Sequence, residues 1–326
     1  MAAKRGVVLL LYAIWYCMEA FFKTCIDLFV PSSFRRLKDV KGEIVLITGG
    51  GAGLGRHLAI GFAKRRATVV IWDVNQHDNV ETARMIRELD AGDVYAYTVD
   101  VSKADQVYAA AERVRQEVGD VTMLVNNAGI AHYKPVLECS EEVVQRTVDV
   151  NAVSHFWLHK AFLPAMKAQN SGHIVTIGSI IAYAPYRSMG AYTSSKCTVI
   201  GIHESLQLDL AYENSAIKLT LACPSGLATG MILGRINTGG ALLSRPDDAA
   251  EEIIEGVLLE KRVLCVPSSA YFMTIVKNLI PVKLMVMLLR SVNLENTFVE
   301  DKEKSEGGTD GGGDDDDDDD NDDGKE

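Results

Sequence analysis

The chain has 326 residues, 48% of them hydrophobic, which is enough for one large α/β domain or two small ones. Its formal net charge is −11, but 15 Asp or Glu and 3 Lys lie within residues 300–326, so the rest of the chain is close to neutral. A near-neutral body excludes a nucleic-acid-binding domain, which would carry a basic face.

Cysteine and histidine spacing argues against a metal site. The six cysteines are scattered and form no C-x-x-C pair, so we expect reduced, buried thiols and a body in the cytosol. His155 and His159 are four residues apart, but no third ligand has a matching spacing and the flanking pattern is that of a packed helix. No bound metal is therefore expected.

The N-terminal segment, residues 1–37, is predicted to attach the chain to a membrane. Residues 7–30 are strongly apolar and follow two basic residues. A signal peptide would need a small-residue cleavage site, which this segment lacks, and a spanning helix would be interrupted by Glu19, Lys23 and Asp27. These three residues are spaced by four and line one helical stripe, which favours a helix lying in the membrane interface over a spanning one.

Residues 38–299 are predicted to form a single catalytic domain. Apolar runs alternate there with helical patterns, which indicates parallel strands joined by crossover helices and therefore a doubly wound parallel sheet, the Rossmann fold. The runs expected as strands are residues 43–48, 68–72, 94–99, 123–125, 173–177, 219–222 and 263–266.

The first expected strand runs into T-G-G-G-A-G-L-G at residues 48–55 and then into a helix. Glycines allow a tight turn and a close approach to a pyrophosphate, and the helix N-terminus supplies oriented N–H groups. The alternative is a plain flexible turn. The cofactor-binding residues predicted in this segment are Thr48, Gly49, Gly51, Gly53, Leu54 and Gly55.

Carboxylates end the next two strands. Asp73 can accept hydrogen bonds from ribose hydroxyls and would repel a 2′-phosphate, and no arginine stands at Ala52, so NAD is favoured over NADP. Asp100, followed by Val101, is a candidate contact to adenine. The alternative for Asp100 is a helix cap shared with Ser102.

Tyr192 and Lys196 are candidates for acid–base chemistry. They are four residues apart in a helical pattern and share a face. We expect the lysine ammonium, with an oxidised nicotinamide nearby, to favour the phenolate, which can then accept an alcohol proton. Ser179 follows an expected strand 13 residues earlier and can hold the substrate oxygen. Taken singly, the pair could be a surface pair and the serine a turn residue.

The C-terminal part is apolar and then acidic. Residues 271–289 are apolar and contain Pro281, which predicts either a broken core helix or a second membrane-contacting element that walls a lipophilic pocket. Residues 300–326 have almost no apolar side chain to bury and are predicted to be a disordered, solvated acidic tail.

Over about residues 41–266 the sequence resembles the short-chain dehydrogenase/reductase family. The matching motifs are T-G-x-x-x-G-x-G at 48–55, N-N-A-G at 126–129, Asn151, Ser179, Y-x-x-x-K at 192–196, and Pro224 with Thr229. The resemblance implies a catalytic set of Asn151, Ser179, Tyr192 and Lys196, with Lys196 also on the nicotinamide ribose and Asn151 holding a water that links Lys196 to solvent. Pairing into a homodimer is expected by analogy.

The same resemblance implies further cofactor contacts. Asn127, Ala128 and Gly129 would line the ribose region, although a purely structural role is an equal alternative. Pro224 and Thr229 would approach the nicotinamide carboxamide. Ser225 stands where many members have glycine, which puts Gly226 in doubt.

Segments such as residues 155–164 and 201–206 resemble a membrane-bound branch that contains retinol and 17-beta-hydroxysteroid dehydrogenases. This implies NAD-dependent oxidation of a lipophilic alcohol, with all-trans-retinol to retinal as the preferred reaction and residues 227–243 as an apolar lid. The alternatives are a hydroxysteroid dehydrogenase, a lipid carbonyl reductase, and a membrane or lipid-droplet surface protein that only keeps the fold. The expected location is the endoplasmic reticulum membrane or lipid droplet, with the catalytic domain facing the cytosol.

Overall fold

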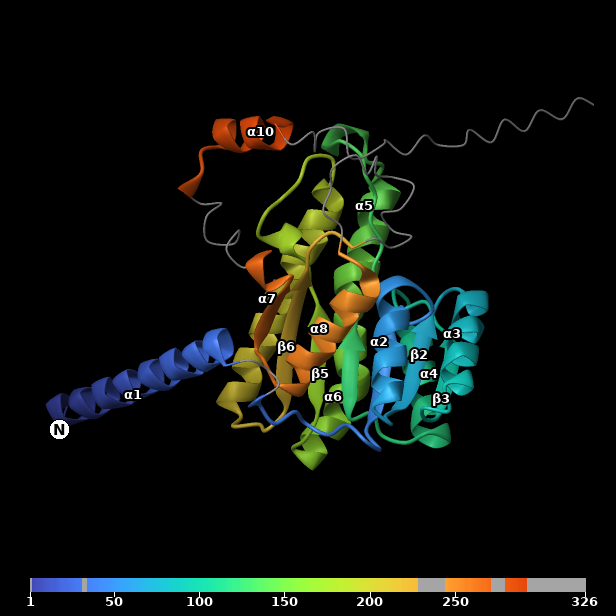
Figure 1. Cartoon of the computed structure of the whole chain (residues 1–326), viewed down its shortest axis with the longest axis horizontal. Helices are drawn as coiled ribbons and strands as arrows, with labels where there is room; N and C mark the ends of the chain where they lie inside the picture. The colour runs from blue at the N-terminus through green and yellow to red at the C-terminus, as the bar shows by residue number, and fades with distance from the viewer. Residues whose placement is uncertain (1, 31–33, 228–243, 271–278, 292–326) are drawn as a thin grey trace, which may run out of the picture.

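The protein is described by a computed structural model that covers residues 2–30, 34–227, 244–270 and 279–291. In that part of the chain one parallel sheet has the strand order β3-β2-β1-β4-β5-β6-β7 (Figure 1). The strands are β1 Ile44–Thr48, β2 Thr68–Asp73, β3 Val94–Thr98, β4 Met123–Asn126, β5 His173–Ile177, β6 Lys218–Pro224 and β7 Val263–Val266. The predicted doubly wound Rossmann fold is confirmed.

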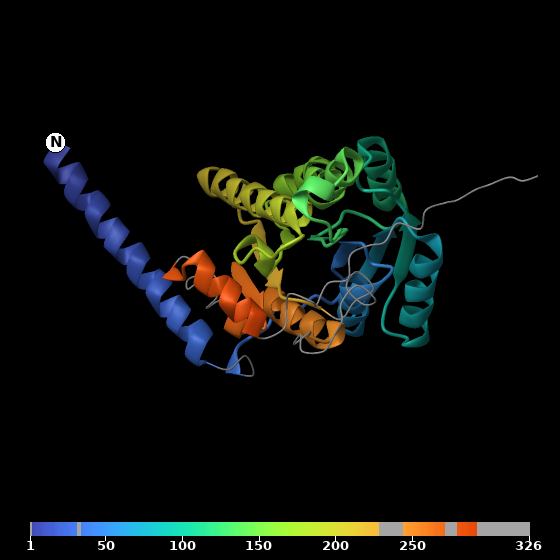
Figure 2. The same ribbon diagram turned by 90° about the horizontal axis from the view of Figure 1, so that it is seen from above.

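Helices cover both faces of this sheet (Figures 1 and 2). The main helices are α1 Ala2–Phe29, α2 Gly53–Lys64, α3 Gln76–Glu88, α4 Ala104–Glu117, α5 Glu141–Val148, α6 Ser154–Gln169, α7 Gly190–Tyr212, α8 Pro246–Leu258 and α10 Val282–Ser291. The short helical segments are η2 Val136–Glu138, η3 Asp149–Val153, η4 Ile180–Ala182 and η5 Ser268–Ala270. Contacts place α2, α3 and α8 together on one face, and α4 with α6 on the other.

Alternation along the strands divides the core between the two faces. Val45 and Ile47 of β1 pack into the cluster under α2 and α8, whereas Leu46 packs with residues of α4 and α6. Side chains of a strand point alternately to opposite faces, so a continuous apolar run is what a sheet covered on both faces requires. The strand order reverses between β1 and β4, and such a switch point opens a crevice at the carboxyl ends of the strands.

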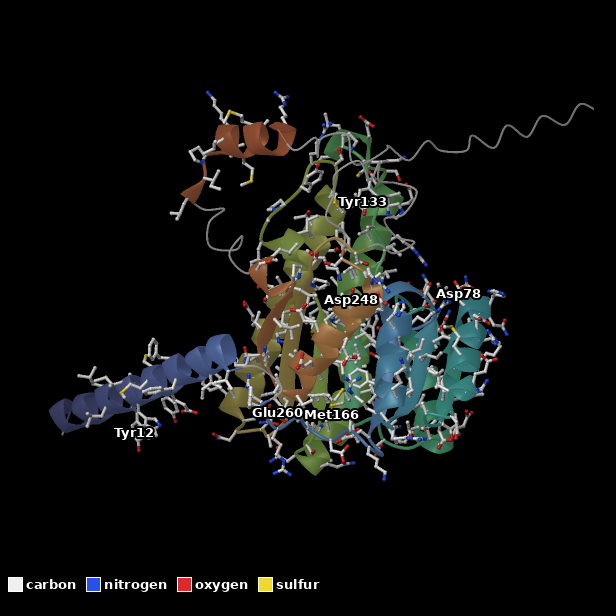
Figure 3. All side chains as sticks on the ribbon, in the orientation of Figure 1. Tyr12, Asp78, Tyr133, Met166, Asp248 and Glu260 are labelled. Atoms are coloured by element: carbon white, nitrogen blue, oxygen red, sulfur yellow. The ribbon has the colours of Figure 1, made fainter. Side chains whose placement is uncertain are left out.

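Two helices lie outside this core. α1 projects from the domain, and large apolar side chains along it are exposed, including Trp15 and Phe21 (Figures 1 and 3). α10 begins directly after Pro281, the predicted break, and also exposes apolar side chains. Among the helices described, none is both long and apolar enough to cross a bilayer. The side chains of Lys23 and Asp27 lie outside the described residues, so the predicted charged stripe is not seen whole.

The cysteines are free where the structure describes them, but the prediction that they are buried is wrong for three: Cys139 is half-buried, and Cys17 and Cys197 are exposed. Cys223 and Cys265 are buried on the paired strands β6 and β7. Cys17 and Cys197 are exposed because they lie on outward faces of α1 and α7. Residues 292–326, which include the predicted acidic tail, lie outside the described part.

Candidate active site

The turn between β1 and α2 needs glycine at several positions. Gly49 and Gly53 adopt positive φ angles of 65° and 53°, which L side chains rarely adopt. A Cβ on Gly55 would lie 2.0 Å from the carbonyl oxygen of Gly49, so this helix start packs directly against the turn. No side chain therefore covers the free backbone N–H groups of the first turn of α2, and such groups can bind a pyrophosphate.

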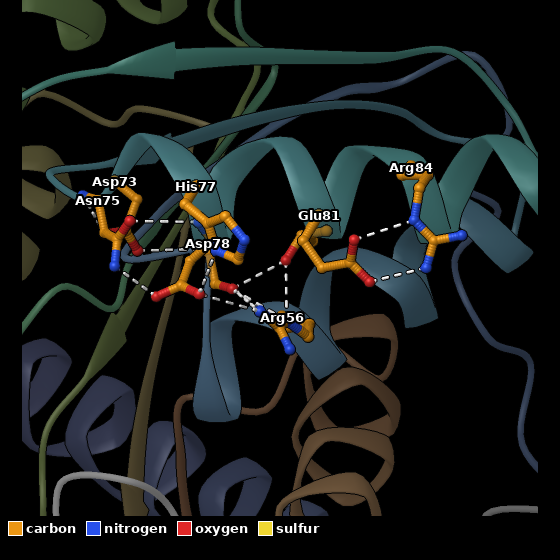
Figure 4. Close-up of polar contacts among 9 residues, drawn as sticks. Arg56, Asp73, Asn75, His77, Asp78, Glu81 and Arg84 are labelled. Carbon is orange, nitrogen blue, oxygen red and sulfur yellow. Dashed lines mark hydrogen bonds and ion pairs between the residues drawn. The ribbon is translucent and has the colours of Figure 1, made fainter.

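Asp73 is fixed at the end of β2 by backbone donors. Its Oδ2 accepts from the amide of Gly51 at 3.0 Å, and its Oδ1 accepts from the amide of Asn75 at 3.0 Å. Asn75 also caps α3 by accepting from the amide of Asp78. Arg56 donates to the carbonyl of Gly51 and lies 3.8 Å from Asp78, which completes the network in Figure 4. The carboxylate is thus held in one orientation at the rim of the turn.

The N-N-A-G segment ties the end of β4 to the end of β1. The amides of Asn127 and Ala128 both donate to Thr48 Oγ1 at 3.0 Å. The side-chain amide of Asn127 donates to the carbonyls of Thr48, at 2.8 Å, and Gly49. These bonds place Asn127, Ala128 and Gly129 in the wall of the cleft, so the segment both stabilises the sheet and lines the pocket.

Asp100 lies in the wall of the cleft, but it does not cap the following helix, because the N-cap of α4 is Lys103 with no side-chain cap. A contact between Asp100 and adenine stays a prediction. Asp100 accepts at its Oδ1 from the amide and the hydroxyl of Ser102, which fixes the loop before α4 locally. It also lines the cleft next to Val101 and pairs with Arg146 of α5 at 3.3 Å. Hydrogen bonds from Ser102 and the charge of Arg146 lower the pKa of Asp100 against the opposing effect of burial, so the carboxylate is ionised at neutral pH.

A cleft of about 380 Å³ joins these parts at the carboxyl ends of the strands. Of the predicted residues, its wall includes Gly49, Gly53, Leu54, Gly55, Asp73, Asp100, Val101, Asn127, Ala128, Gly129, Ser179, Tyr192, Lys196 and Pro224. Thr48 and Gly51 lie behind the wall and hold it through the bonds given above. Thr229 and the predicted lid beyond Leu227 lie outside the described residues. A glycine cradle with a fixed carboxylate at one end fits a dinucleotide.

Asn151 lies in η3, a π-helical segment between α5 and α6. Its Oδ1 accepts from the amide of Ile130, and its Nδ2 donates to the carbonyl of Ile130, both at 2.8 Å. Nδ2 also donates to the hydroxyl of Ser195 on α7 at 3.0 Å. Single π-helical turns within helices are common at functional sites. This one carries a fully buried amide that joins the loop after β4 to the helix of Tyr192 and Lys196.

Ser179, Tyr192 and Lys196 converge at the other end of the cleft. A side-chain hydrogen bond links Ser179 and Tyr192. The Nζ of Lys196 lies 5.8 Å from the centre of the Tyr192 ring and donates to the carbonyl of Ile177 at 2.8 Å. Lys196 is 4% exposed, and burial lowers its pKa to about 8.

In the chain without a cofactor, the pKa of Tyr192 is not lowered by Lys196. Burial raises the pKa of Tyr192 to about 12, and the hydrogen bond with Ser179 opposes this only in part. Desolvation disfavours the phenolate and the ammonium alike, so the partly buried Tyr192 and the buried Lys196 do not form a tight ion pair by themselves. For Tyr192 to act as a base near neutral pH, the site would need a further positive charge.

Several wall residues were not predicted. Arg146 reaches the cleft from α5, and Val74 and Ile130 follow the ends of β2 and β4. The two apolar residues carried a usable signal, because they directly follow predicted site residues at strand ends. Arg146 is one of many exposed charges on a helix, and nothing in its local pattern distinguishes it.

Comparison with known proteins agrees with this geometry. The family model for short chain dehydrogenase matches residues 43–237. Epidermal retinol dehydrogenase 2 of Homo sapiens is 41% identical over 273 residues, covering 82% of this chain and 88% of that protein. Estradiol 17-beta-dehydrogenase 11 of Macaca fascicularis is 38% identical over 280 residues, with coverages of 86% and 90%. Retinol dehydrogenase 10 of Xenopus tropicalis is 40% identical, with coverages of 78% and 83%.

Solved structures show the same fold. A short chain dehydrogenase/reductase from Burkholderia phymatum in complex with NAD superposes with a TM-score of 0.68 at 22% identity, over 80% of this chain and 98% of that one. An alcohol dehydrogenase from Thermococcus sibiricus, complexed with 5-hydroxy-NADP, gives a TM-score of 0.62 at 23% identity, over 69% and 96%. The chain is an oxidoreductase that belongs to the short-chain dehydrogenase family.

Proposed function

We propose that this enzyme oxidises a lipophilic alcohol with NAD, and that its preferred reaction is all-trans-retinol to retinal. The observation that carries the proposal is the placement of Ser179, Tyr192 and Lys196 at one end of a cleft whose other end holds the fixed carboxylate of Asp73. A dinucleotide likewise carries its nicotinamide at one end and its adenosine ribose toward the other. The carboxylate favours two ribose hydroxyls over a 2′-phosphate, which supports NAD.

The residues divide the chemistry among them. NAD, when bound, supplies the hydride acceptor and a positive charge. Tyr192 takes the proton of the substrate hydroxyl on its phenolic oxygen, and Ser179 holds the substrate oxygen through its hydroxyl. Lys196 holds the ribose and keeps Tyr192 ionised once the site carries the added positive charge. The side chain of Asn151 holds the helix that carries both residues through its hydrogen bond to Ser195. Asn151 also holds a water that links Lys196 to solvent.

The substrate class is supported by the relatives and by the exposed apolar elements. Two of the relatives are named retinol dehydrogenases. α10 lies at the same end of the molecule as Tyr133, which packs with Tyr192 (Figures 1 and 3). Leu137, in η2, is 98% exposed. Exposed apolar side chains on α1, on α10 and at Leu137 suit an enzyme that takes its substrate from a membrane or lipid-droplet surface.

The location follows from the same argument. We propose attachment through α1 to the endoplasmic reticulum membrane or lipid droplet, in the membrane interface, with the catalytic domain in the cytosol. A homodimer that pairs through the helices next to Asn151 and Tyr192 remains part of the proposal by analogy.

A second candidate is a hydroxysteroid dehydrogenase, or a reductase of lipid carbonyl compounds, because one relative is named estradiol 17-beta-dehydrogenase 11. Both candidates use the same residues, so only the substrate distinguishes them. A surface protein without activity is the remaining alternative. The presence of Asn151, Ser179, Tyr192 and Lys196, each held by a hydrogen bond, argues against it.

The test is NADH formation by membranes that contain the full-length protein. All-trans-retinol, estradiol and a short-chain alcohol are offered with NAD⁺ or NADP⁺, and retinal is identified by chromatography. We expect the highest kcat/KM for retinol with NAD⁺, and loss of at least about a hundredfold in Tyr192→Phe. Preference for estradiol would select the second candidate. Wild-type rates in Tyr192→Phe would refute the mechanism.

A further inference from the structure

Four charged side chains lie in the described part of the cleft wall: Asp73, Asp100, Arg146 and Lys196. Lys196 belongs to the catalytic end of the cleft. Asp73 ends β2, and Asp100 stands two residues after β3. Arg146, from the last turn of α5, pairs with Asp100 and is the other cation of the described wall. The acid–base chemistry proposed for Tyr192 does not use Arg146.

The two carboxylates flank the same end of the cleft. β2 and β3 are paired with Asp73 opposite Thr98, and the amide of Val99 donates to the carbonyl of Asp73 at 2.9 Å. A dinucleotide carries negative charge on its pyrophosphate, so two neighbouring carboxylates oppose its binding. Arg146 offsets the charge of Asp100 and leaves that of Asp73 for the ribose hydroxyls.

Asp100 has few acceptor positions left for a ligand. An ionised carboxylate offers about four lone-pair positions, two on each oxygen. Oδ1 accepts from the amide of Ser102 at 3.0 Å and from its hydroxyl at 2.7 Å. Oδ2 lies 3.3 Å from Nη1 of Arg146. Within the described part of the chain, one acceptor position therefore remains, on Oδ2 and beside the guanidinium.

This ion pair is open to the cleft and adds little to the fold. The side chain of Asp100 is 17% exposed and that of Arg146 is 49% exposed, and both residues line the wall. Exposed ion pairs contribute little to stability, because solvent screens them and two side chains lose freedom. α5 is also held by its packing against α7 and η3. The pair is therefore better suited to orienting a carboxylate than to stabilising the domain.

We propose that Arg146 is a positioning residue that makes the cleft select adenine, because it holds Asp100 so that the free acceptor position on Oδ2 can take a hydrogen bond from the 6-amino group. This inference rests on the proposed function, since it concerns the cofactor of that reaction. The 6-amino group of adenine is a donor, whereas an oxygen at position 6 of a purine is an acceptor, which a carboxylate repels. Arg146 thus acts on the choice of base through Asp100.

Two other functions of Arg146 would have different effects on binding. Direct contact of the guanidinium with the pyrophosphate, or with the face of the base, would strengthen the binding of every purine dinucleotide alike. A purely structural ion pair would affect stability and not the choice of base. An effect through Asp100 instead depends on the group at position 6. The preference for one base over another therefore separates the three.

The test measures the dissociation constants of the full-length protein for NAD⁺ and for nicotinamide hypoxanthine dinucleotide by titration calorimetry. Hypoxanthine carries an oxygen in place of the 6-amino group and a proton on the neighbouring ring nitrogen. Arg146→Gln removes the positive charge, and Arg146→Lys keeps it. Asp100→Asn replaces one carboxylate oxygen by a donor. The double variant Asp100→Asn with Arg146→Gln completes the cycle.

Arg84→Gln is the matched control. The side chain of Arg84 is 54% exposed, close to that of Arg146, and it also pairs with a carboxylate, that of Glu81 at 2.7 Å. Arg84 lies on α3, outside the described wall of the cleft (Figure 4). Melting temperatures establish that each variant folds.

The wild-type protein should bind NAD⁺ about tenfold more tightly than the hypoxanthine analogue, because a hydrogen bond to a charged acceptor is lost. Arg146→Gln should reduce this ratio to about threefold or less, and Arg146→Lys should restore most of it. Asp100→Asn should abolish or reverse the ratio, and the double variant should not differ from it. Arg84→Gln should keep the wild-type ratio.

Equal affinity of the wild-type protein for the two dinucleotides would overturn the inference. So would an Arg146→Gln variant that keeps the wild-type ratio, whether or not it binds both dinucleotides more weakly, because its effect would then not depend on position 6. A further fall of the ratio in the double variant would show that Arg146 does not act through Asp100. If the wild-type protein binds no dinucleotide, the proposed function fails and the inference fails with it. Binding of NAD⁺ and oxidation of retinol, with an unchanged ratio in Arg146→Gln, removes the inference alone.

Discussion

Replacement of Asp73 by asparagine should change the choice between NAD and NADP. The carboxylate receives two backbone N–H groups, from Gly51 and Asn75, one on each oxygen. Asparagine keeps the shape but loses the charge, and one of its two positions becomes a donor that faces a backbone donor. The variant should therefore bind the adenosine ribose less well and lose its repulsion of a 2′-phosphate.

The magnitude follows from the geometry. Two unit charges about 4 Å apart interact by about 4 kcal/mol at an effective dielectric of about 20. Asp73 is only partly buried, so solvent screens this repulsion. Even about 1.4 kcal/mol of relieved repulsion improves NADP⁺ binding about tenfold. Lost hydrogen bonds from ribose hydroxyls to a charged acceptor cost about 1.5–3 kcal/mol each, which weakens NAD⁺ binding by about tenfold or more.

Dissociation constants for NAD⁺ and NADP⁺, measured by titration calorimetry, give the ratio directly. Asp78→Asn is the matched control, because Asp78 belongs to the same network as Asn75 and Arg56 but does not line the cleft (Figure 4). We expect the NAD⁺ preference to fall by about a hundredfold in Asp73→Asn and by less than about threefold in the control. An unchanged preference in Asp73→Asn would show that another residue selects the cofactor.

Three further predictions concern the turn and the buried pair. Gly55→Ala should abolish cofactor binding and lower the melting temperature, because its Cβ would meet the carbonyl of Gly49 at 2.0 Å; calorimetry measures both. Burial lowers the pKa of Lys196 to about 8, so the charged lysine destabilises the fold by a constant amount below pH 8. This destabilisation disappears as pH rises toward about 10.4, and the melting temperature should rise with it. Lys196→Met should remove that rise. The affinity for NAD⁺ should rise from pH 7 to pH 10, and Tyr192→Phe should weaken this pH dependence. An NAD⁺ affinity of the wild-type protein that does not change with pH would contradict this prediction.

The sheet was predictable because burial on both faces leaves continuous apolar runs. Six of the seven strands agree with the prediction to within one residue at each end. The run at residues 219–222 is longer in the structure, at Lys218–Pro224, because β6 pairs with β5 along its first part and with β7 along its last. Pairing partners that lie elsewhere in the sequence extended this strand beyond its apolar run.

The site was predictable where residues end a strand, because parallel strands bring their carboxyl ends to one edge. Asp73 and Ser179 are such residues. Arg146 is not, because α5 is brought to the cleft by its packing against α7, which lies far from it in the sequence. The direction of the Tyr192 pKa shift could not be predicted from the sequence either. The spacing places Lys196 nearby, but the balance between the lysine charge and desolvation depends on burial, which a sequence pattern does not measure.

The raised pKa of Tyr192 ties the strength of the base to the bound cofactor. A tyrosine with a pKa of about 12 is almost wholly neutral at pH 7, and the neighbouring Lys196 is itself near its own midpoint at pH 8. The chain without cofactor therefore holds no strong base beside the substrate site. A positive charge placed over the pair stabilises the phenolate and, by linkage, the phenolate stabilises that charge by the same free energy. A reduced cofactor would not carry this charge, so the pKa of Tyr192 would be higher in a complex with the reduced cofactor than in one with the oxidised cofactor. Desolvation of Tyr192 and Lys196 would thus couple the proposed acid–base step to the redox state of the cofactor, whereas water would screen an exposed pair and weaken this coupling.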